Sequence, residues 1–536
     1  MYVKLYGAHL SGIEGQIVEV EVDIAPGLPQ FDIVGLPGTA LKESKERVRS
    51  AIRNSGYQFP TKRITVNLAP AHVRKEGSFF DLAMALAILI ADGQVSVPKK
   101  VSNQFSRLLF IGELALDGTT RKSEGIYPLL LAAKQEGFSY VFLPVANAAE
   151  AQSLEGIRPI LIKSLKQLVQ ICLRPESWGK PDEKSPDHKG EKAAGCSRVI
   201  RMSEKRDNND REQPKAHTEL FEDIVGQEHV KRACEIAAAG FHHMMMVGPP
   251  GSGKTMLARR LISILPPLTE EEWTEMAKVH SVAGIWDSDT YRRNVRLFRA
   301  PHHTITVAGM LGGGNPVKPG EISLAHHGVL FLDEFLEFKR SVIEALREPL
   351  EMRHVTITRQ HHRYIFPSSF LLVIALNPCP CGYYGYETEK NPCICTATQI
   401  ERYRAKLSGP IIDRIDLQVE VPLLSYDEIV GADVPQSDSY STSNIRCRVE
   451  QALAFKQERT NSDKPNGLLT AQEVKATCQL SREAEVFMRE VFEYHQLSMR
   501  GYHKILKVAR TIADLNEHEL IVEEDIAEAV GYRLGK

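Results

Sequence analysis

An eight-residue run in the middle of the chain restricts the choice of fold more than any other feature. It matches the pattern G-x-x-x-x-G-K-[ST] and consists of Gly248, Pro249, Pro250, Gly251, Ser252, Gly253, Lys254 and Thr255. An apolar run, 244–247, precedes it and a helix-like run follows, which is the strand–loop–helix setting of a phosphate-binding loop (P-loop). Backbone N–H groups of such a loop and the N-terminus of its helix bind phosphate oxygens. The sequence therefore predicts an α/β fold that binds ATP, with Lys254 on the β and γ phosphates and the Thr255 hydroxyl on Mg²⁺.

Two further apolar runs end in polar residues, as strands of a parallel sheet do. The run 329–332 is followed by Asp333 and Glu334, and the run 370–376 by Asn377. Because catalytic groups gather at the carboxyl ends of buried parallel strands, we expect Asp333 to hold Mg²⁺ through water and Glu334 to polarise the attacking water. Asn377 either orients that water and contacts the γ-phosphate or forms a turn before Pro378.

Two arginines are candidates for contact with a transferred phosphoryl group. Arg414 lies in the apolar segment 409–416, and Arg500 lies in 497–503 at the start of an expected helix. A cation supplied by a neighbouring subunit can stabilise the charge that develops on the phosphoryl group. From spacing alone, a surface ion pair is the simpler explanation for each arginine.

Four of the nine cysteines form a cluster of two C-x-C pairs separated by 11 residues: Cys379, Cys381, Cys393 and Cys395. Four thiolates suit a structural zinc ion, although this spacing is tighter than the usual C-x₂₋₄-C. The alternative is four reduced thiols on an exposed loop. Two histidine pairs match no metal-binding spacing, and we expect hydrogen-bonding roles for them at the nucleotide or the subunit boundary: His302 with His303, and His326 with His327.

Two segments are candidates for loops that reach into a pore. Residues 304–315 contain a flexible glycine-rich tip, and residues 354–365 alternate like a β-hairpin. The tip of the second segment is basic, with Arg359, His361, His362 and Arg363. It would track a phosphate backbone, or it is a solvated hairpin with no ligand.

Composition bounds the organisation of the chain. At ~150 residues per domain, 536 residues correspond to about three or four domains. The net charge of −2 gives no general support for nucleic-acid binding, so any such site must be local. No apolar run reaches the ~18 residues of a membrane span, and the N-terminus lacks a signal-peptide layout. We therefore expect a cytoplasmic protein with no membrane partner.

The predicted boundaries divide the chain into an N-terminal domain (1–175), a polar flexible linker (176–218), an ATPase core (219–442) and a helical lid (443–536). The four-cysteine insertion occupies 379–395 of the core. Within the N-terminal domain, hydrophobic periodicity predicts strands and helices, and an Asp-Gly pair predicts a hairpin turn. The strands are expected at 16–24 and 64–68, the helices at 39–54 and 79–91, and the hairpin at 110–120.

Taken in order, these motifs resemble the Mg-chelatase-like AAA+ ATPases, and within them the competence-type ComM/YifB branch. The resemblance reaches both ends of the chain and is carried by the segments 31–53, 300–304, 377–385 and 504–513. It implies an AAA+ core of the helix-2-insert and pre-sensor-1-hairpin class with a helical lid. It also implies an α+β N-terminal domain similar to the Lon protease domain (ribosomal S5-type).

The resemblance also implies roles and an activity. Asn377 would be sensor 1, Arg414 the arginine finger and Arg500 sensor 2. The chain would form a homohexameric, ATP-dependent ring that acts on single-stranded and branched DNA. As a helicase it would drive branch migration, and so promote integration of single-stranded DNA in natural transformation and homologous recombination. The alternatives are a chelatase-like motor that remodels a protein partner and a Lon-like ATP-dependent protease.

The sequence itself argues against proteolysis. The Lon nucleophile lies in Lys-Asp-Gly-Pro-Ser, whereas 75–79 read Lys-Glu-Gly-Ser-Phe, with Phe79 at the serine position and Ser78 one residue early. A shift of one residue in a tight turn misdirects a nucleophile. We expect the domain to bind DNA or to help assemble the ring instead, and its candidate DNA contacts are Lys62, Arg63, Arg74 and Lys75.

Overall fold

The computed structural model describes residues 2–36, 38–71, 75, 77–98, 104–174, 178, 220–286, 295–359, 362–407, 409–424 and 440–534. The chain divides into two compact units, unit 1 (Met1–Pro214 with Ala277–Asp289) and unit 2 (Lys215–Met276 with Thr290–Lys536). The predicted linker, 176–218, lies outside the described residues except for Trp178. In the part of the chain that the structure describes, no helix combines the length and the hydropathy of a transmembrane segment.

Unit 1 contains a four-stranded sheet in the order β1-β2-β4-β3. β1 (Tyr2–Ser11), β2 (Glu14–Ala25) and β4 (Arg63–Ala69) pair antiparallel. β3 (Gln30–Val34) pairs parallel to β4 and is connected to it through α1 (Thr39–Asn54). Burial alternates along β2 and β4 because successive side chains of a strand point to opposite faces.

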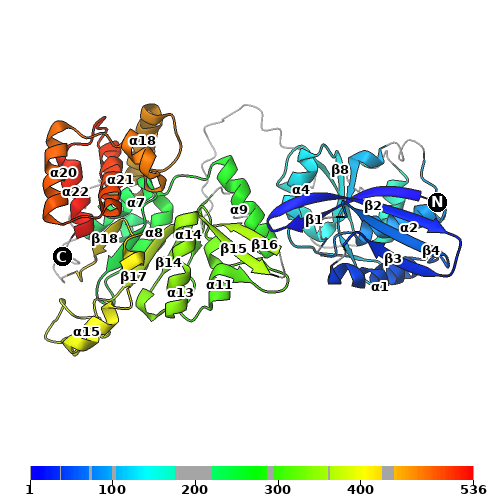
Figure 1. Ribbon diagram of the computed structural model, residues 1–536, viewed down its shortest axis with the longest axis horizontal. Coiled ribbons are helices and arrows are strands. Elements are labelled where there is room, and N and C mark those ends of the chain that lie inside the picture. Colours follow the sequence, from blue (N-terminus) through cyan, green and yellow to red (C-terminus); the bar gives the residue numbers. More distant parts are fainter. Residues whose placement is uncertain are drawn as a thin grey trace. The chain divides into compact units, whose positions relative to one another are not determined.

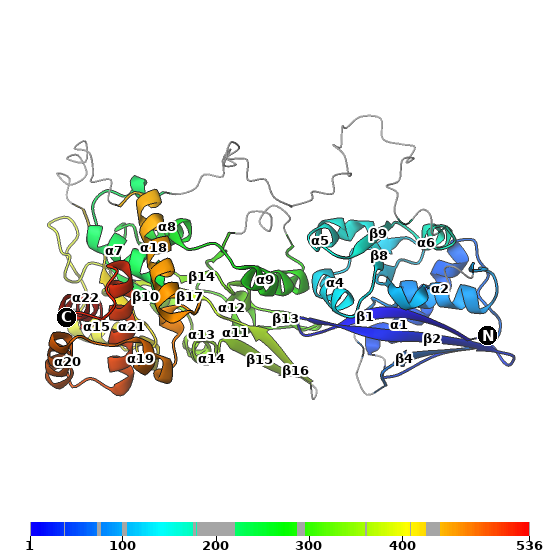
Figure 2. The same ribbon diagram turned by 90° about the horizontal axis from the view of Figure 1, so that it is seen from above.

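A fully buried helix packs on one face of this sheet. All residues of α2 (Asp81–Ala91) are buried, including Asp81, whose carboxylate accepts a hydrogen bond from Arg47 Nε at 2.9 Å. Burial raises the pKa of Asp81 to about 6, and the Arg47 guanidinium opposes that shift. Figure 2 shows α2 and α4 (Ile126–Gln135) on the same side of the β1–β2 hairpin.

A second sheet of unit 1 is parallel and has the order β5-β8-β9. Its strands are β5 (Leu108–Phe110), β8 (Tyr140–Pro144) and β9 (Arg158–Ile162), and α5 (Ala148–Gln152) and α6 (Leu165–Cys172) complete this half. A hairpin, β6 (Glu113–Leu114) with β7 (Thr120–Arg121), surrounds the Asp-Gly turn. The predicted strands at 16–24 and 64–68, helices at 39–54 and 79–91, and hairpin are confirmed, whereas this second sheet was not predicted, because short buried strands show no alternation.

Unit 1 also includes 277–289, a segment that the predicted boundaries place in the ATPase core. Ser281, near the end of α9 (Glu270–Ala283), donates from its hydroxyl to Glu150 at 2.7 Å. The same hydroxyl oxygen accepts the backbone N–H of Tyr127 at 3.1 Å. This segment is therefore part of the buried hydrogen bonding of unit 1, although it is distant in sequence.

Unit 2 is built on a five-stranded parallel sheet in the order β11-β14-β17-β10-β18. The strands are β11 (Phe298–Arg299), β14 (Val329–Leu332), β17 (Leu371–Leu376), β10 (Met244–Val247) and β18 (Leu417–Glu420). The three predicted core strands are confirmed at β10, β14 and β17. Because β17 lies between β10 and β14, the end of the P-loop strand and the end of the acidic strand are separated by one strand.

Helices and two insertions surround this sheet. α7 (Glu228–Gly240), α8 (Lys254–Ile264), α12 (Glu321–Leu324), α13 (Arg340–Ala345), α14 (Arg347–Met352), α15 (Ala397–Arg404) and α16 (Gly409–Ile412) are the helices of the core. The first insertion holds α11 (Val307–Leu311) and the pair β12 (Gly312–Gly313) and β13 (Lys318–Pro319). The second is the predicted hairpin, β15 (His354–Arg359) with β16 (His362–Pro367).

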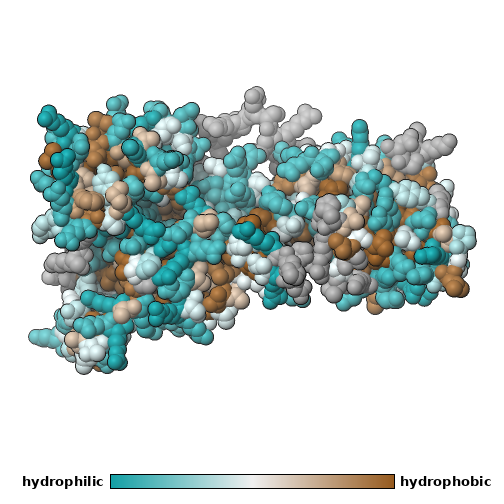
Figure 3. All heavy atoms as spheres, viewed as in Figure 1, coloured by the Kyte–Doolittle hydropathy of each residue, from teal (hydrophilic) through white to brown (hydrophobic). Residues whose placement is uncertain are grey.

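The C-terminal part of unit 2 is helical, as predicted. α18 (Thr442–Thr460), α19 (Ala471–Thr477), α20 (Arg482–Tyr494), α21 (Met499–Leu515) and α22 (Glu523–Leu534) form a lid coloured orange to red in Figure 1. A capping box of Thr470 and Glu473 begins α19. In Figure 3, polar and charged side chains cover most of the visible face of the lid.

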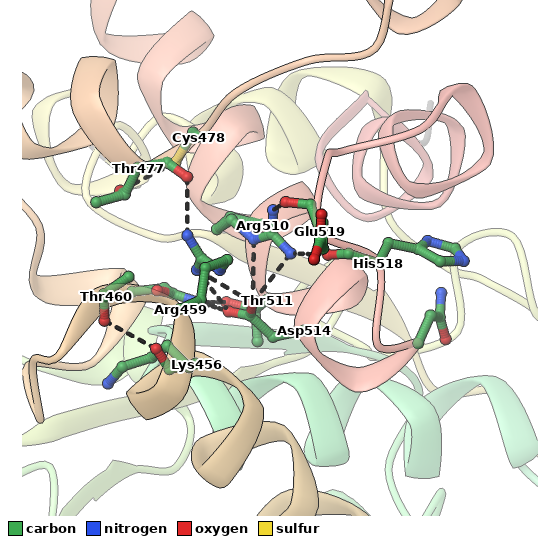
Figure 4. A network of polar contacts seen from close by, with 12 residues as sticks. Lys456, Arg459, Thr460, Thr477, Cys478, Arg510, Thr511, Asp514, His518 and Glu519 are labelled. Carbon is green, nitrogen blue, oxygen red and sulfur yellow. Dashed lines mark hydrogen bonds and ion pairs between the residues drawn. The ribbon is translucent and has the colours of Figure 1, made fainter.

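A buried polar network fixes the lid helices to one another (Figure 4). Arg510 has no exposed surface and donates to the Asp514 carboxylate at 3.1 Å and to the carbonyl of Glu519 at 2.8 Å. Arg459 of α18 donates to the same carboxylate at 3.1 Å and to the carbonyl of Thr477 at 3.0 Å. Since each buried charge is paired, this network holds α21 in place, and with it Arg500 near the start of that helix.

A second polar cluster joins α21 to the sheet. Lys504 Nζ donates to Asp416 at 2.6 Å, and the Asp416 carboxylate also accepts the backbone N–H of His243 at 3.1 Å. The backbone N–H of Leu372 donates to His243 Nδ1 at 3.1 Å. His243 must therefore be neutral at Nδ1, because a protonated ring nitrogen cannot accept.

Acidification is expected to destabilise unit 2 through His243. Burial lowers the pKa of His243 to about 4, although the Asp416 carboxylate raises it, and its ordinary value is about 6.5. The unfolded chain therefore binds more protons between pH 6.5 and 4, so the free energy of unfolding falls as the pH falls through that window. One proton gives a slope of up to about 1.4 kcal/mol per pH unit.

Urea unfolding followed at a series of pH values measures this slope. In His243→Gln the amide oxygen can still accept the Leu372 N–H but does not titrate, so the slope should be smaller. Equal slopes for the parent and the variant would contradict the assignment.

Candidate nucleotide-binding and hydrolysis site

The P-loop joins β10 to α8 and surrounds a buried cation. Gly253 precedes α8 with φ +89, a left-handed conformation that favours glycine. Lys254 is 8% exposed, and its Nζ donates to the carbonyls of Gly248 at 2.7 Å and Pro249 at 2.9 Å. Burial lowers the pKa of Lys254. No carboxylate among the described residues lies within ion-pair distance of this ammonium, so its surroundings fit a phosphate anion.

Oxygen ligands of the kind that Mg²⁺ prefers lie beside the loop. The Thr255 hydroxyl donates to Asp333 Oδ2 at 2.7 Å, and Asp333 Oδ1 accepts the backbone N–H of Glu334 at 2.9 Å. A hydroxyl and a carboxylate that share the phosphate side of a P-loop are suited to hold a hydrated Mg²⁺. The carboxyl end of β14 and the first turn of α8 thus meet at one place.

Glu334 and Asn377 complete this group. Glu334 has φ +49, which is unusual for a non-glycine residue and turns the chain sharply after β14. Its carboxylate is 55% exposed and lies 3.4 Å from His303 Nδ1. Asn377 Oδ1, at the end of β17, accepts a hydrogen bond from Lys254 Nζ at 3.3 Å. The structure therefore brings the predicted residues of three separate segments together.

One residue that hydrogen-bonds to the backbone of the P-loop was not predicted from the sequence. Gln227, with φ +52, donates from Nε2 to the carbonyls of Ser252 and Pro422, both at 3.1 Å. It connects the P-loop to the chain that follows β18. Its only signal in the sequence is its place before the first helix of unit 2.

Arg414 and Arg500 converge on one carboxylate that was not predicted. Arg414 Nη2 forms an ion pair with Glu351, and Arg500 Nη2 donates to the same Oε1 at 2.7 Å. They line a cavity of about 370 Å³ together with Arg353 and Lys504. Arg414 Nε is buried without a hydrogen-bond partner among the described residues. The lining holds five lysine and arginine side chains against three carboxylates, so its positive balance suits an anion from another molecule.

The two insertions of unit 2 contact each other. Arg359 Nη1 donates to the carbonyl of Gly314 at 2.8 Å, so the hairpin is joined to the glycine-rich tip. Arg359 and Arg363 are exposed. His361 and the side chain of His362 lie outside the described residues.

The candidate DNA contacts of unit 1 differ in accessibility. Arg63 is exposed, Lys62 is 53% exposed and pairs with Asp92 at 2.9 Å, and Arg74 lies outside the described residues. Lys75 has no exposed surface, and its ammonium donates to the carbonyl of Pro70. The expectation for Lys75 is therefore corrected, because a buried side chain cannot contact a nucleic acid.

Among the described residues of the same region, Ser78 and Lys75 do not pair with each other. The Ser78 hydroxyl donates to Glu113, and the partner of Lys75 is a backbone carbonyl. Because Ser78 is paired with a carboxylate and not with Lys75, this geometry gives a serine–lysine protease no support.

The four clustered thiols lie at the distances of a tetrahedral metal site. Cys379 Sγ is 3.3 Å from Cys381 Sγ and 3.9 Å from Cys393 Sγ, and Cys381 and Cys393 are 3.6 Å apart. All four sulfurs, including that of Cys395, lie within 4.8 Å of one another. A tetrahedral Zn²⁺ with Zn–S bonds of about 2.3 Å places its sulfurs about 3.8 Å apart. Backbone N–H groups of Cys381 and Tyr384 point at Sγ of Cys395 and Cys379, each at 3.4 Å, and would support thiolates.

A second cluster, Glu275 with His326 and His327, fits a metal less well. Both Nε2 atoms contact the Glu275 carboxylate, at 3.0 and 2.8 Å. His326 Nδ1 accepts the backbone N–H of Ser369 at 3.0 Å, so the proton of a neutral His326 is on Nε2. That nitrogen donates to Glu275 and has no lone pair for a metal. Hydrogen bonding by this pair is confirmed, whereas its expected place at the nucleotide or the subunit boundary stays a prediction.

A parallel sheet with a P-loop on one strand, an acidic pair on another, an intervening strand between them and a helical lid define a P-loop ATPase of the AAA+ class. Three family models match the chain: "Magnesium chelatase, subunit ChlI" over 220–429, "Subunit ChlI of Mg-chelatase" over 20–147, and "Magnesium chelatase, subunit ChlI C-terminal" over 439–533.

Curated relatives match nearly the full length. "Competence protein ComM" of Haemophilus influenzae is 38% identical over 531 residues, which cover 99% of this chain and 97% of that protein. "Uncharacterized protein YifB" of Escherichia coli K12 is 37% identical over 522 residues, 97% of this chain and 95% of that protein. A partial match, 30% identical over 185 residues, is to Lon protease 2 of Bacillus subtilis and covers 31% of this chain and 32% of that protein. The chain belongs to the ComM/YifB branch of the Mg-chelatase-like AAA+ ATPases and has a Lon-like N-terminal region.

Proposed function

We propose that this protein is an ATP-dependent DNA motor that works as a homohexameric ring. As a helicase on single-stranded and branched DNA, it drives branch migration and promotes integration of single-stranded DNA in natural transformation and homologous recombination. The observation that carries the proposal is the convergence of Lys254, Thr255, Asp333 and Asn377 at one place, in a chain that aligns over 99% of its length with a protein named for competence.

In the proposed cycle each group of the site has one task. Lys254 neutralises the β and γ phosphates, while Thr255 and Asp333 hold hydrated Mg²⁺. Glu334 polarises the attacking water, and Asn377 orients it and senses the γ-phosphate. ATP and Mg²⁺ supply the energy and the charge neutralisation, and these side chains position the reactants.

Arg414 acts as the arginine finger on the nucleotide of a neighbouring subunit, and Arg500 contacts phosphate as sensor 2. The support is their shared partner Glu351 and the cavity that they line, whose cationic side chains outnumber its carboxylates. An arriving phosphate replaces Glu351 as the counterion, which couples the nucleotide state of one subunit to the position of the next.

The DNA-contacting elements are the two joined insertions, with Arg359 and Arg363 as the phosphate contacts, together with Lys62 and Arg63 of unit 1. We further propose that Cys379, Cys381, Cys393 and Cys395 bind one structural Zn²⁺. The sulfur spacing and the N–H groups directed at two sulfurs support this assignment.

DNA should stimulate the steady-state ATPase rate, and this is the measurement that tests the function. The rate is compared without DNA, with single-stranded DNA and with a forked duplex, using Glu334→Gln as the blank. Replacing both Arg359 and Arg363 by Ala should leave the basal rate unchanged and abolish most of the stimulation, because two phosphate contacts are lost. Lys475→Ala, which removes an exposed cation of the lid, is the matched control.

An active ATPase with no response to either DNA would overturn the proposal. It would favour a chelatase-like motor that remodels a protein partner, a candidate supported by the three family models of the magnesium chelatase subunit.

A further inference from the structure

The loop of the four cysteines lies directly against the P-loop. Gly382 has φ +89, and a Cβ added there would lie 2.5 Å from Pro250 Cδ and 2.7 Å from its Cγ. Carbon atoms in contact are ordinarily about 3.5–4.0 Å apart. The backbone at Gly382 therefore lies so close to the phosphate-binding loop that only glycine fits there. In Figure 1 the segment that follows this loop contains α15 and is coloured yellow.

Residues that touch the P-loop lie on both sides of the first two cysteines. Asn377, which accepts a hydrogen bond from Lys254, precedes Cys379 by two residues, and Gly382 directly follows Cys381. The backbone N–H of Gly382 donates to the carbonyl of Cys379 at 3.0 Å. The buried strand β17 already fixes the position of Asn377, so it is the contact of Gly382 with the P-loop that depends on where the first two cysteines lie.

Apart from its thiols, the loop is held by a few contacts at its start, which include a hydrogen bond from Arg404 to the carbonyl of Pro378 at 3.3 Å and one from the Tyr386 hydroxyl to Glu420 at 3.5 Å. Of its four thiols only Cys379 is buried, and Ile394, between the other two cysteines, is 80% exposed. A segment with so little apolar burial cannot offset its ordering entropy through packing. A metal bound by four thiolates supplies that free energy, as it does in small zinc-stabilised folds.

We infer that the four-cysteine loop, when it binds zinc, supports the P-loop in its nucleotide-binding conformation, so that zinc occupancy sets the affinity for the nucleotide. This inference rests on the zinc site proposed above but not on the DNA activity. Without zinc Gly382 moves away from Pro250, and the backbone of the P-loop loses its support on that side.

Two variants of the full-length chain distinguish the loss of zinc from the loss of the contact that supports the P-loop. Cys393→Ser should lose zinc and weaken nucleotide binding about tenfold, the effect of losing roughly 1.4 kcal/mol. Gly382→Ala keeps all four thiols, so it should retain zinc, yet its methyl group pushes on Pro250 and should weaken binding by a similar factor. The double variant Gly382→Ala with Pro250→Ala removes the clashing ring and should recover part of the affinity.

The measurements are the zinc content per chain by plasma mass spectrometry and the dissociation constant of a fluorescent ATP analogue. Cys447→Ser, an exposed thiol outside the cluster, should change neither quantity. Lys254→Ala should lose nucleotide affinity and keep its zinc. Circular dichroism checks that each variant is folded.

Three results would overturn the inference. A parent protein without zinc would remove the metal site, and a zinc-free Cys393→Ser with full nucleotide affinity would remove the coupling. A Gly382→Ala variant with unchanged affinity would show that the contact with Pro250 does not support the loop.

Discussion

Replacing Glu334 by Gln is expected to lower the rate of ATP hydrolysis by about 10²–10⁴-fold, the contribution of a positioned general base. ATP binding should persist, because Lys254, Thr255 and Asp333 hold the phosphates and Mg²⁺ without it. Glutamine has the same shape, and the half-exposed Glu334 supports no buried ion pair, so the fold should be unaffected. Steady-state phosphate release and binding of a fluorescent ATP analogue measure the two effects.

Glu337→Gln is the matched control for this experiment. Glu337 is an exposed acid three residues further along the chain, and its only ion-pair contact among the described residues is with Lys406 at 3.9 Å. Its replacement should leave hydrolysis within about twofold of the parent, as surface substitutions ordinarily do. An unchanged rate in Glu334→Gln would remove Glu334 from the catalytic role.

Replacing Arg414 by Ala is expected to lower hydrolysis by at least about 10³-fold, the lower end of the effect of an arginine finger. Its own subunit should still bind ATP, because the described residues of the P-loop do not contact Arg414. Loss of the pair with Glu351 should cost little stability, since that carboxylate is 44% exposed. The ATPase rate and the melting temperature test these two expectations separately.

Mixing two inactive variants tests whether Arg414 acts between subunits. In a mixed ring, an Arg414→Ala subunit keeps its P-loop, and a Lys254→Ala neighbour provides the missing arginine. Activity should therefore reappear on mixing and should be greatest near equal amounts. If the mixture stays as inactive as its components while both variants still assemble, Arg414 acts within its own subunit or not at all.

The order of the core motifs and their secondary structure could be predicted because each depends on neighbouring residues. The apolar runs before Gly248, Asp333 and Asn377 become adjacent buried strands of one sheet, since continuous apolar runs suit strands covered on both faces. Thr470 caps α19 through hydrogen bonds to residues within one turn. Parallel strands then bring their carboxyl ends to one edge of the sheet. For this reason most residues of the candidate ATP site could be predicted from the sequence.

Partners that are distant in sequence could not be predicted. Lys75 reads as a surface cation, but only the folded unit reveals that its side chain is enclosed and donates to Pro70. Nothing in the sequence distinguishes Glu351 from the other acidic residues, but packing brings Arg414 and Arg500 to it. Local pattern does not determine burial or the choice of a charged partner, because both depend on which surfaces meet in three dimensions.

The sequence by itself determined that this chain binds a nucleotide on a parallel α/β sheet, because the phosphate-binding loop and its flanking strand and helix are encoded in consecutive residues. Only the tertiary structure decided which elements support that loop. The contact of Gly382 with Pro250 and the hydrogen bonds from Gln227 to Ser252 and Pro422 join segments more than 20 residues apart. Such contacts form only once the core has packed, since close packing rather than local preference determines which backbones can approach each other.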